Sequence, residues 1–192
     1  MQKNIKENIR KEVLARRRGL SEVYRKQASE AIMNRLCEET VWQKAVTVFL
    51  YYGYKDEVQT ERLILQALSE GKKVYLPRVI SDEEMAFLRI QSLDDLESGA
   101  FGIKEPPYRG DDRKNTSETD RPDIIVVPCV AVSRDGNRIG HGKGYYDRYL
   151  SLIGDVPFLC LAFDCQLVGA FEAESMDIRM DTIITEHETI RT

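Results

Sequence analysis

The sequence predicts an α/β fold: a three-layer α/β/α domain with an open, largely parallel (mixed) central sheet. Short apolar runs typical of buried strands alternate with amphipathic helical patterns along the chain. The clearest unit consists of a strand-like run at 45–52, a helical pattern at 60–71 and a second strand-like run at 73–79. Such a unit forms a right-handed crossover between parallel strands. With 192 residues, the chain is expected to fold as a single domain, 1–192.

The first forty residues predict two helices that are separated by Gly19. Apolar residues recur at helical spacing over 5–14 and again over 24–36. Gly19 ends the first helix, and Ser21 is a suitable N-cap for the second. The arginines 16–18 stand at the C-terminus of the first helix, where cations complement the helix dipole. On that ground we assign them no further function.

Strands and short helices are predicted over the rest of the chain. Residues 85–90 are strand-like, and 92–99 predict a short helix with a capping box. The segment 109–121 contains no apolar residue and is expected to form an exposed loop. Residues 123–133 are the most hydrophobic run and predict one central strand. A helix is then expected over 145–153, followed by strands over 158–164 and, as the last, 182–185.

The composition argues against several functional classes. The formal charge of −4 disfavours a general nucleic-acid binder. An RNA-binding module built on the basic segment 10–19 is a weak alternative, because this segment contains no aromatic side chain for stacking on bases. No apolar run approaches the ~20 residues of a membrane span, and the N-terminus lacks a signal-peptide core. We therefore expect a cytoplasmic protein with no nucleic-acid and no membrane partner.

The cysteines and histidines do not predict a zinc site or a disulfide framework. The four cysteines show no CxxC spacing, and the two histidines lie far apart in the sequence. Buried thiols in a reducing compartment are the simplest interpretation.

A glycine-rich stretch, GNRIGHGKGYYDRYL at 136–150, directly follows the predicted central strand and leads into a predicted helix. Open α/β sheets bind ligands at the carboxyl ends of their strands. Glycines let backbone N–H groups approach an anion, and the helix N-terminus adds positive charge. The spacing matches neither a Rossmann fingerprint nor a Walker A loop. A multiply charged phosphate is the predicted ligand, with a turn that uses glycines for geometry alone as the alternative.

Charged residues elsewhere also suit a phosphate ligand. Asp147, in the first turn after the glycines, either complements the helix dipole or holds Mg²⁺ beside a polyphosphate. Lys6 and Arg10 lie four apart on one helix face and repel unless an anion lies between them; a solvated face is the alternative. Asp177 and Asp181 precede the last predicted strand, and only folding could bring either near Asp147.

Together these residues resemble the 5-formyltetrahydrofolate cyclo-ligase family, also called methenyltetrahydrofolate synthetase. The stretch NRIGHGKGYYDRYL is similar to the family signature NRLGxGxGYYDxxL. The resemblance extends over nearly the whole chain in the family's order, through KENIR (6–10), DEVQT (56–60), LPRV (76–79), FGIKEP (101–106), VVPCVAVSRDGNR (126–138) and LAFDCQ (161–166).

The resemblance implies an ATP- and Mg²⁺-dependent cyclisation of 5-formyltetrahydrofolate to 5,10-methenyltetrahydrofolate, with release of ADP and phosphate. The implied route passes through a phosphorylated formyl group, an imidate phosphate. The implied partners are ATP and 5-formyltetrahydrofolate, and we expect a monomer. The alternative is a nucleotide-binding regulator of the same fold without cyclo-ligase activity. Such a regulator should lose the folate-side residues, but Glu57 and Phe101 are both present.

The resemblance also implies the roles of individual residues. Arg138, Lys143 and Tyr145 would be catalytic, and Asp147 and Asp177 would bind Mg²⁺, with Asp181 as the alternative to Asp177. The ATP-binding residues would be Lys6, Arg10, Arg138, Ile139, Gly140, His141, Gly142, Lys143, Gly144, Tyr145 and Tyr146. The folate-binding residues would be Tyr52, Glu57, Phe101, His141, Gly142, Lys143, Gly144 and Tyr145.

The folate-side assignments have a chemical basis. Glu57 would accept paired hydrogen bonds from the amino and ring N–H groups of the pterin. Tyr52, Phe101 and Tyr145 are candidate walls for the flat rings, with ordinary core packing as the alternative. The family varies at His141, and some members carry tryptophan at the place of Phe101.

Overall fold

The computed structural model describes residues 2–99, 102–108 and 120–192. Its helices are α1 (Gln2–Arg18), α2 (Glu22–Glu38), α3 (Thr40–Lys44), α4 (Glu61–Ser69) and α5 (Tyr145–Ile153). Four of these were predicted, and α3 was not. The hydroxyl of Ser21 accepts a hydrogen bond from the backbone N–H of Tyr24, so the predicted N-cap of α2 is confirmed. Within the described ranges, no helix is long and apolar enough to cross a membrane.

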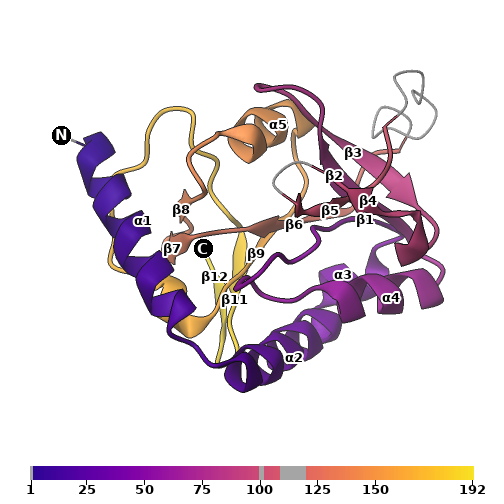
Figure 1. Ribbon diagram of the computed structural model, residues 1–192, viewed down its shortest axis with the longest axis horizontal. Coiled ribbons are helices and arrows are strands. Elements are labelled where there is room, and N and C mark those ends of the chain that lie inside the picture. Colours follow the sequence, from indigo (N-terminus) through magenta and orange to yellow (C-terminus); the bar gives the residue numbers. More distant parts are fainter. Residues whose placement is uncertain (1, 100–101, 109–119) are drawn as a thin grey trace.

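The central sheet has seven strands and is open, mixed and largely parallel, as predicted (Figure 1). Its order is β12 (Thr189–Arg191), β11 (Thr182–Ile184), β9 (Phe158–Leu161), β6 (Ile124–Pro128), β1 (Thr47–Phe49), β2 (Lys73–Val79) and β3 (Met85–Ile90). The five inner strands are parallel, and the two edge strands, β12 and β3, are antiparallel to their neighbours. The predicted crossover from β1 through α4 to β2 is confirmed.

Two smaller sheets accompany the central one. The first has the order β10 (Leu167–Val168), β7 (Ala131–Ser133) and β8 (Arg138–Ile139). The second is a hairpin of β4 (Glu97–Ser98) and β5 (Lys104–Glu105). The prediction of a helix over 92–99 was wrong in extent, because only a 3₁₀ turn forms at Leu93–Asp95 and Glu97–Ser98 are the strand β4; the predicted capping box of Ser92 and Asp95 is present. A second 3₁₀ turn lies at Asp164–Gln166. The predicted loop 109–121 falls mostly outside the described residues.

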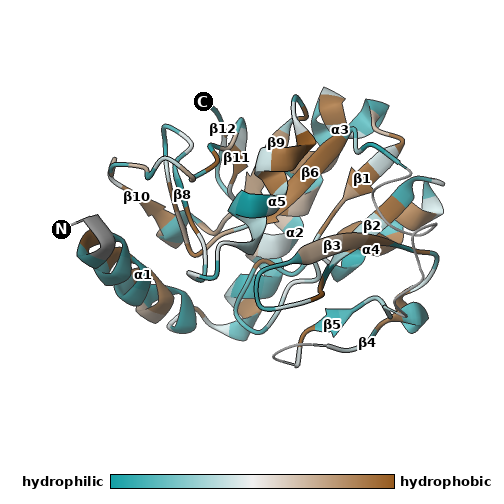
Figure 2. Ribbon diagram, turned by 90° about the horizontal axis from the view of Figure 1, so that it is seen from above, coloured by the Kyte–Doolittle hydropathy of each residue, from teal (hydrophilic) through white to brown (hydrophobic). Residues whose placement is uncertain are grey.

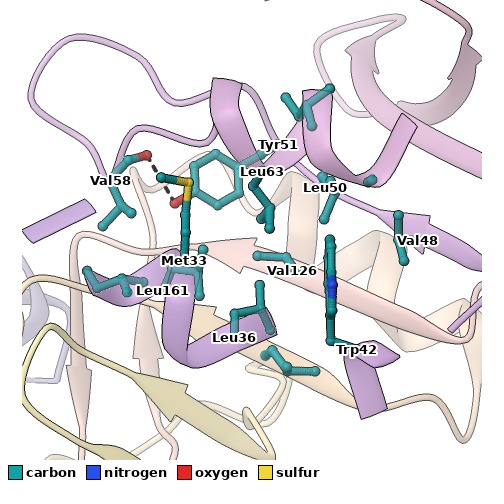
Figure 3. Close-up of a cluster of buried hydrophobic side chains, with 14 of the residues drawn as sticks. Met33, Leu36, Trp42, Val48, Leu50, Tyr51, Val58, Leu63, Val126 and Leu161 are labelled. Atoms are coloured by element: carbon teal, nitrogen blue, oxygen red, sulfur yellow. Dashed lines mark hydrogen bonds between the residues drawn. The ribbon is translucent and has the colours of Figure 1, made fainter. Parts of the chain in front are cut away.

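Alternating strand residues supply the cores on the two faces of the central sheet. On one face, Val48 and Val126 join the cluster that packs against α2, α3 and α4 (Figure 3). On the other face, Phe49, Ile125 and Val127 join the cluster that includes residues of α5. This alternation is the period of two that a strand imposes on its side chains. Buried on both faces, the inner strands β1, β6 and β9 are largely hydrophobic (Figure 2).

Helix α1 packs apart from these two layers, against the small sheet beside the central one (Figure 1). Val13 of α1 forms a third cluster with Val130, Ala131 and Ile139, which belong to β7, β8 and the residue before β7. Because β8 leads directly into the glycine-rich loop at 140–144, this cluster places α1 beside that loop.

The prediction of a single strand over 123–133 was wrong, because the chain leaves the central sheet at Cys129. Strand β6 ends at Pro128, and β7 begins at Ala131 in the small sheet. The buried amide of Gln166 donates to the carbonyl oxygens of Cys129 and Val130 at 2.8 and 3.0 Å. Without Gln166 the buried carbonyl of Val130 would lose this donor, and the carbonyl of Cys129 would keep only the longer hydrogen bond of 3.3 Å from Arg17. The position of β6 in the middle of the sheet is confirmed.

Two further details differ from the prediction. The strand β11 is not the last one, since β12 follows and pairs with it antiparallel. All four cysteines are free; Cys129 and Cys160 are buried, whereas Cys37 and Cys165 are half-buried.

Replacing Gln166 by leucine tests how the break between β6 and β7 is stabilised. The change removes one donor from each of two buried carbonyls, of which that of Cys129 keeps Arg17 at 3.3 Å, and it removes the acceptor for the N–H of Phe163, 2.9 Å away. We expect the free energy of unfolding to fall by about 2–4 kcal/mol in urea titration, because each unpaired buried group costs about 1–3 kcal/mol. The exposed Gln43→Leu is the control and should change it by less than about 0.5 kcal/mol. A loss below about 1 kcal/mol for Gln166→Leu would contradict this account.

Candidate active site

The strand order reverses between β1 and β6. From β1 the chain runs through α4 to β2, and from β6 it runs through α5 to β9 on the opposite side. Open α/β sheets bind ligands in the crevice outside the carboxyl ends of the strands at such a switch point. A cavity of about 580 Å³ lies there, and its size suits a small-molecule site. It is lined by segments after β1, by parts of β2 and β5, by the glycine-rich loop with the start of α5, and by the end of α1.

The glycine-rich loop has a backbone that requires glycine at two positions. Gly142 has φ +93°, and Gly144, the N-cap of α5, has φ +70°. The loop is fastened to α1, because Nε of Arg10 donates to the carbonyl oxygen of Gly140 at 2.8 Å. A Cβ at Gly142 would lie 3.6 Å from the Arg10 guanidinium, so the loop packs closely on this side chain.

Lys6 and Arg10, predicted to share an anion, both have partners within the protein. The ammonium group of Lys6, which is buried, forms ion pairs with Asp177 and with Glu174, the latter at 3.2 Å. Arg10 binds the glycine-rich loop as described above. Carboxylates and a carbonyl therefore relieve the repulsion between the two cations, and an external anion is not required for that purpose.

Arg138 and Asp147 form an ion pair at the start of α5. Arg138 is buried, and its guanidinium donates to the carbonyl of Pro128 at 3.1 Å and to Oδ1 of Asp147 at 2.9 Å. The backbone N–H of Ile178 approaches the same oxygen at 3.4 Å. Folding thus brings the segment that contains Asp177 against Asp147. Asp181 instead accepts a hydrogen bond from the N–H of Phe158 at 2.7 Å.

The two carboxylates present oxygens that suit Mg²⁺. Asp147 uses Oδ1 in its hydrogen bonds, and Asp177 uses Oδ2 for Lys6 and the N–H of Glu174. Neither Oδ2 of Asp147 nor Oδ1 of Asp177 has a hydrogen-bond partner in the part of the chain that the structure describes. No group of three metal-binding side chains occurs among these residues. Mg²⁺ commonly takes one or two carboxylates and completes its shell with water and substrate phosphates, so this donor set fits it.

Glu57 joins the segment after β1 to the glycine-rich loop. Its Oε1 lies 3.1 Å from Nε2 of His141, and its Oε2 accepts from the N–H of Tyr54 at 3.1 Å. Both Glu57 and His141 line the cavity. The residue predicted for the folate side and the loop predicted for the nucleotide therefore meet in one place.

Two of the three predicted aromatic walls line the cavity. Tyr52 donates to Glu61 at 2.8 Å, and burial together with this bond raises the pKa of Tyr52 to about 12. Tyr145 donates to the carbonyl oxygen of Ser81 at 3.1 Å. Both rings are thus fixed by their hydroxyl groups. Phe101 lies outside the described residues.

Tyr146 lines the cavity with a hydroxyl that is buried and has no hydrogen-bond partner in the described ranges. The guanidinium carbon of Arg138 lies 5.7 Å from the centre of its ring. Burial raises the pKa of the Tyr146 phenol, the charge of Glu57 raises it further, and Arg138 opposes both effects. The phenol is accordingly a neutral hydrogen-bond donor.

The structure brings most of the predicted site residues to this cavity. Those that line it are Tyr52, Glu57, Arg138, Gly140, His141, Lys143, Gly144, Tyr145, Tyr146 and Asp147. Lys6, Arg10, Ile139, Gly142 and Asp177 are not among its described lining residues, although Arg10 and Asp177 contact or adjoin residues that are.

Several lining residues were not predicted from the sequence: Arg17, Arg18, Tyr54, Lys55, Asp56 and Lys104. Assigning the arginines 16–18 to the helix dipole alone was wrong for Arg17, which is buried in an ion pair with Asp56. Asp56 could have been found from the sequence, because it is the first residue of the segment DEVQT (56–60), which also contains Glu57.

Comparison with known proteins agrees with the resemblance. The model of the 5-formyltetrahydrofolate cyclo-ligase family matches residues 2–186. A probable 5-formyltetrahydrofolate cyclo-ligase from Caenorhabditis elegans is 29% identical, over 98% of this chain and 96% of the relative. The solved structure of 5,10-methenyltetrahydrofolate synthetase from Aquifex aeolicus is 33% identical, with a TM-score of 0.85 over 97% of this chain and 92% of that one.

A second solved structure, a 5,10-methenyltetrahydrofolate synthetase from Mycoplasma pneumoniae, is 28% identical, with a TM-score of 0.75 over 94% of this chain and 98% of that one. The similarity therefore holds in sequence and in fold over nearly the full length. Because the family model spans almost the whole chain, this protein belongs to the 5-formyltetrahydrofolate cyclo-ligase family of ATP-dependent ligases.

Proposed function

We propose that this protein cyclises 5-formyltetrahydrofolate to 5,10-methenyltetrahydrofolate in a reaction that needs ATP and Mg²⁺ and releases ADP and phosphate. The observation that carries the proposal is the meeting of Glu57 and the glycine-rich loop in one cavity, with 3.1 Å between Glu57 and His141. A reaction between a triphosphate and a folate requires their binding groups to adjoin in this way.

The chemistry proposed for the site has two steps. The formamide oxygen is a poor leaving group, so the γ-phosphoryl group of ATP is first transferred to it, which gives an imidate phosphate and ADP. N10 of the same folate then attacks the formyl carbon, the carbon–oxygen bond breaks, and phosphate leaves while N10 loses its proton. Phosphoryl transfer depends mainly on positioning and on neutralising charge. Holding N10 beside the formyl carbon promotes the second step through proximity.

The cations of the site divide into two groups. Lys6, Arg10 and Arg138 are engaged by protein acceptors and are suited to fixing the loop and the carboxylates. Lys143 lines the cavity, and its ammonium group has no ion-pair or hydrogen-bond partner among the described residues. Because Lys143 belongs to the glycine-rich loop, its side chain is suited to neutralise phosphate charge together with the backbone N–H groups of that loop. Arg138 acts by orienting Asp147.

Asp147 and Asp177 would hold the Mg²⁺ through the oxygens that carry no hydrogen bond. When bound, the ion neutralises charge on the phosphates during transfer. On the folate side, Glu57 would accept hydrogen bonds from the pterin, and the fixed rings of Tyr52 and Tyr145 would bound the flat part of the molecule.

The appearance of 5,10-methenyltetrahydrofolate, followed by its absorbance, tests the proposed function directly. We expect product only when 5-formyltetrahydrofolate, ATP and Mg²⁺ are all present, because each enters the proposed reaction. Omitting any one of the three serves as the control. If the folded protein formed no product with all three, the proposed reaction would be refuted.

Two substitutions separate the nucleotide side from the folate side. Asp147→Asn should raise the Mg²⁺ concentration needed for half-maximal turnover by about tenfold or more and leave folate binding without nucleotide unchanged. Glu57→Gln should raise the KM for 5-formyltetrahydrofolate by about tenfold, because a charge-assisted hydrogen bond contributes about 1.5–3 kcal/mol, and it should spare the KM for ATP. Steady-state kinetics measure both effects.

Asp181→Asn is the matched control for the first variant, since Asp181 binds Phe158 instead of approaching Asp147. Its Mg²⁺ requirement should stay at the wild-type value. Equal, small effects of Asp147→Asn and Glu57→Gln would show that the two roles are misassigned.

Tyr146→Phe tests whether the unpaired hydroxyl contacts a ligand. The change breaks no hydrogen bond within the described protein, so the melting temperature should not fall. We expect kcat/KM to decrease about tenfold, the equivalent of one lost hydrogen bond of about 1.4 kcal/mol. The control Tyr24→Phe removes a remote hydroxyl bonded to Glu186 at 2.6 Å and should show unchanged kinetics. Unchanged kinetics for Tyr146→Phe as well would leave this hydroxyl with a packing role only.

A further inference from the structure

An ion pair between buried Arg17 and half-buried Asp56 adjoins Glu57 in the chain. Arg17, near the end of α1, is 2% exposed, and its Nη2 lies 3.2 Å from Oδ1 of Asp56, the residue before Glu57. Its Nη1 donates to the carbonyl oxygen of Cys129 at 3.3 Å. One side chain thus joins α1, the segment after β1 and the point where the chain leaves β6.

This pair is poorly suited to stabilising the fold for its own sake. Nε of Arg17 and Oδ2 of Asp56 are both buried and have no hydrogen-bond partner in the ranges described. A largely buried ion pair with unpaired atoms gains little over apolar side chains of similar volume, because desolvation offsets much of the attraction. Burial alone would raise the pKa of Asp56, but the hydrogen bond and charge of Arg17 outweigh it and hold that pKa below its usual range. The pair is therefore ionic at neutral pH.

The loop that carries Glu57 contains backbone strain. Lys55, the residue before Asp56, has φ +51°, a left-handed value that is unfavourable for a side chain with a Cβ. Such a conformation persists only where surrounding contacts determine it. The turn is also tight, because a Cβ at Gly53 would lie 2.3 Å from the carbonyl oxygen of Val58. The contact of Asp56 with Arg17 fastens this strained turn to α1.

The same helix holds the glycine-rich loop. Arg10 and Arg17 are seven residues apart and therefore lie on one face of α1. Arg10 binds the carbonyl of Gly140, and Arg17 binds Asp56. The contact between Glu57 and His141 at 3.1 Å links the turn that carries Glu57 directly to the glycine-rich loop. Helix α1 thus sets the separation of the two parts of the cavity.

We propose that Arg17 is a positioning residue for folate binding: through Asp56 it fixes the turn at 53–58 so that Glu57 meets the folate beside the glycine-rich loop. The inference rests on the proposed function, in which Glu57 binds the pterin. Arg17 itself touches neither the pterin nor the phosphates in this account, and acts by fixing the place of the Glu57 carboxylate.

The test is the double variant Arg17→Met/Asp56→Asn, which removes both charges and so leaves neither one buried without its partner. We expect its melting temperature to stay within about 4 °C of the wild-type value. The KM for 5-formyltetrahydrofolate should rise about tenfold, while the KM for ATP changes less than twofold and kcat less than threefold. Arg17→Lys, which keeps the charge but lacks the forked geometry, should give an intermediate folate KM and carries the test if the double variant does not fold.

Arg16→Met is the matched control, because Arg16 neighbours Arg17 but is exposed and pairs with Glu12 along the helix. Its two KM values should equal those of the wild type. If the double variant were active with an unchanged KM for 5-formyltetrahydrofolate, the role of Arg17 would be refuted, whereas the proposed function would stand. Parallel increases in both KM values with a lower melting temperature would likewise refute the role of Arg17, since they indicate a purely structural role. Absence of product from the wild-type protein would instead refute the proposed function.

Discussion

The parallel pairing of β1 with β6 is the constraint on which the site depends. Because the crossovers from these neighbouring strands run to opposite sides, their carboxyl ends are left uncovered at the same edge of the sheet. The segment after β1 brings Glu57 to this edge, and the segment after β6 brings Arg138 and the glycine-rich loop. Two loops that lie about eighty residues apart in the sequence therefore share one cavity, which a two-substrate reaction requires.

Local patterns in the sequence were sufficient for the elements whose boundaries are set by local chemistry. The strands β2 and β3 begin and end at the predicted residues, since their apolar runs are bounded by polar and turn-forming residues. The run 123–133 could not be divided in the same way, because it is continuously hydrophobic. Its break depends on Gln166, whose amide arrives from more than thirty residues further along the chain. The antiparallel edge strand β12 is short and half-buried, so its pattern is weak.

The candidate site was predictable in its residue types and less so in their contacts. Spacing singled out Lys6 and the glycine-rich stretch, but the partner of Lys6, Asp177, lies 171 positions away and is fixed only by folding. Arg17 could not be told apart from Arg16 by sequence, since both stand in one run of arginines. Which arginine is buried depends on how α1 packs on the small sheet. Val13 faces that sheet, and Arg17, one helical turn later, lies on the same buried face.

Contacts made by charged groups fix several side chains of the site before any ligand is bound. Ion pairs and hydrogen bonds within the protein fix Arg10, Arg138 and Arg17, so their side chains need not be ordered when substrates arrive. Lys143 also lines the cavity, and its ammonium group has no ion-pair or hydrogen-bond partner among the described residues; in the proposed function it is available for a phosphate. Arg10 holds the glycine-rich loop through Gly140, Arg138 holds the carboxylate of Asp147, and Arg17 holds the turn before Glu57 through Asp56. Arg10 and Arg17 both project from α1. Movement of this helix would therefore shift the glycine-rich loop and the turn before Glu57 together, so the position of α1 determines the geometry of the cavity.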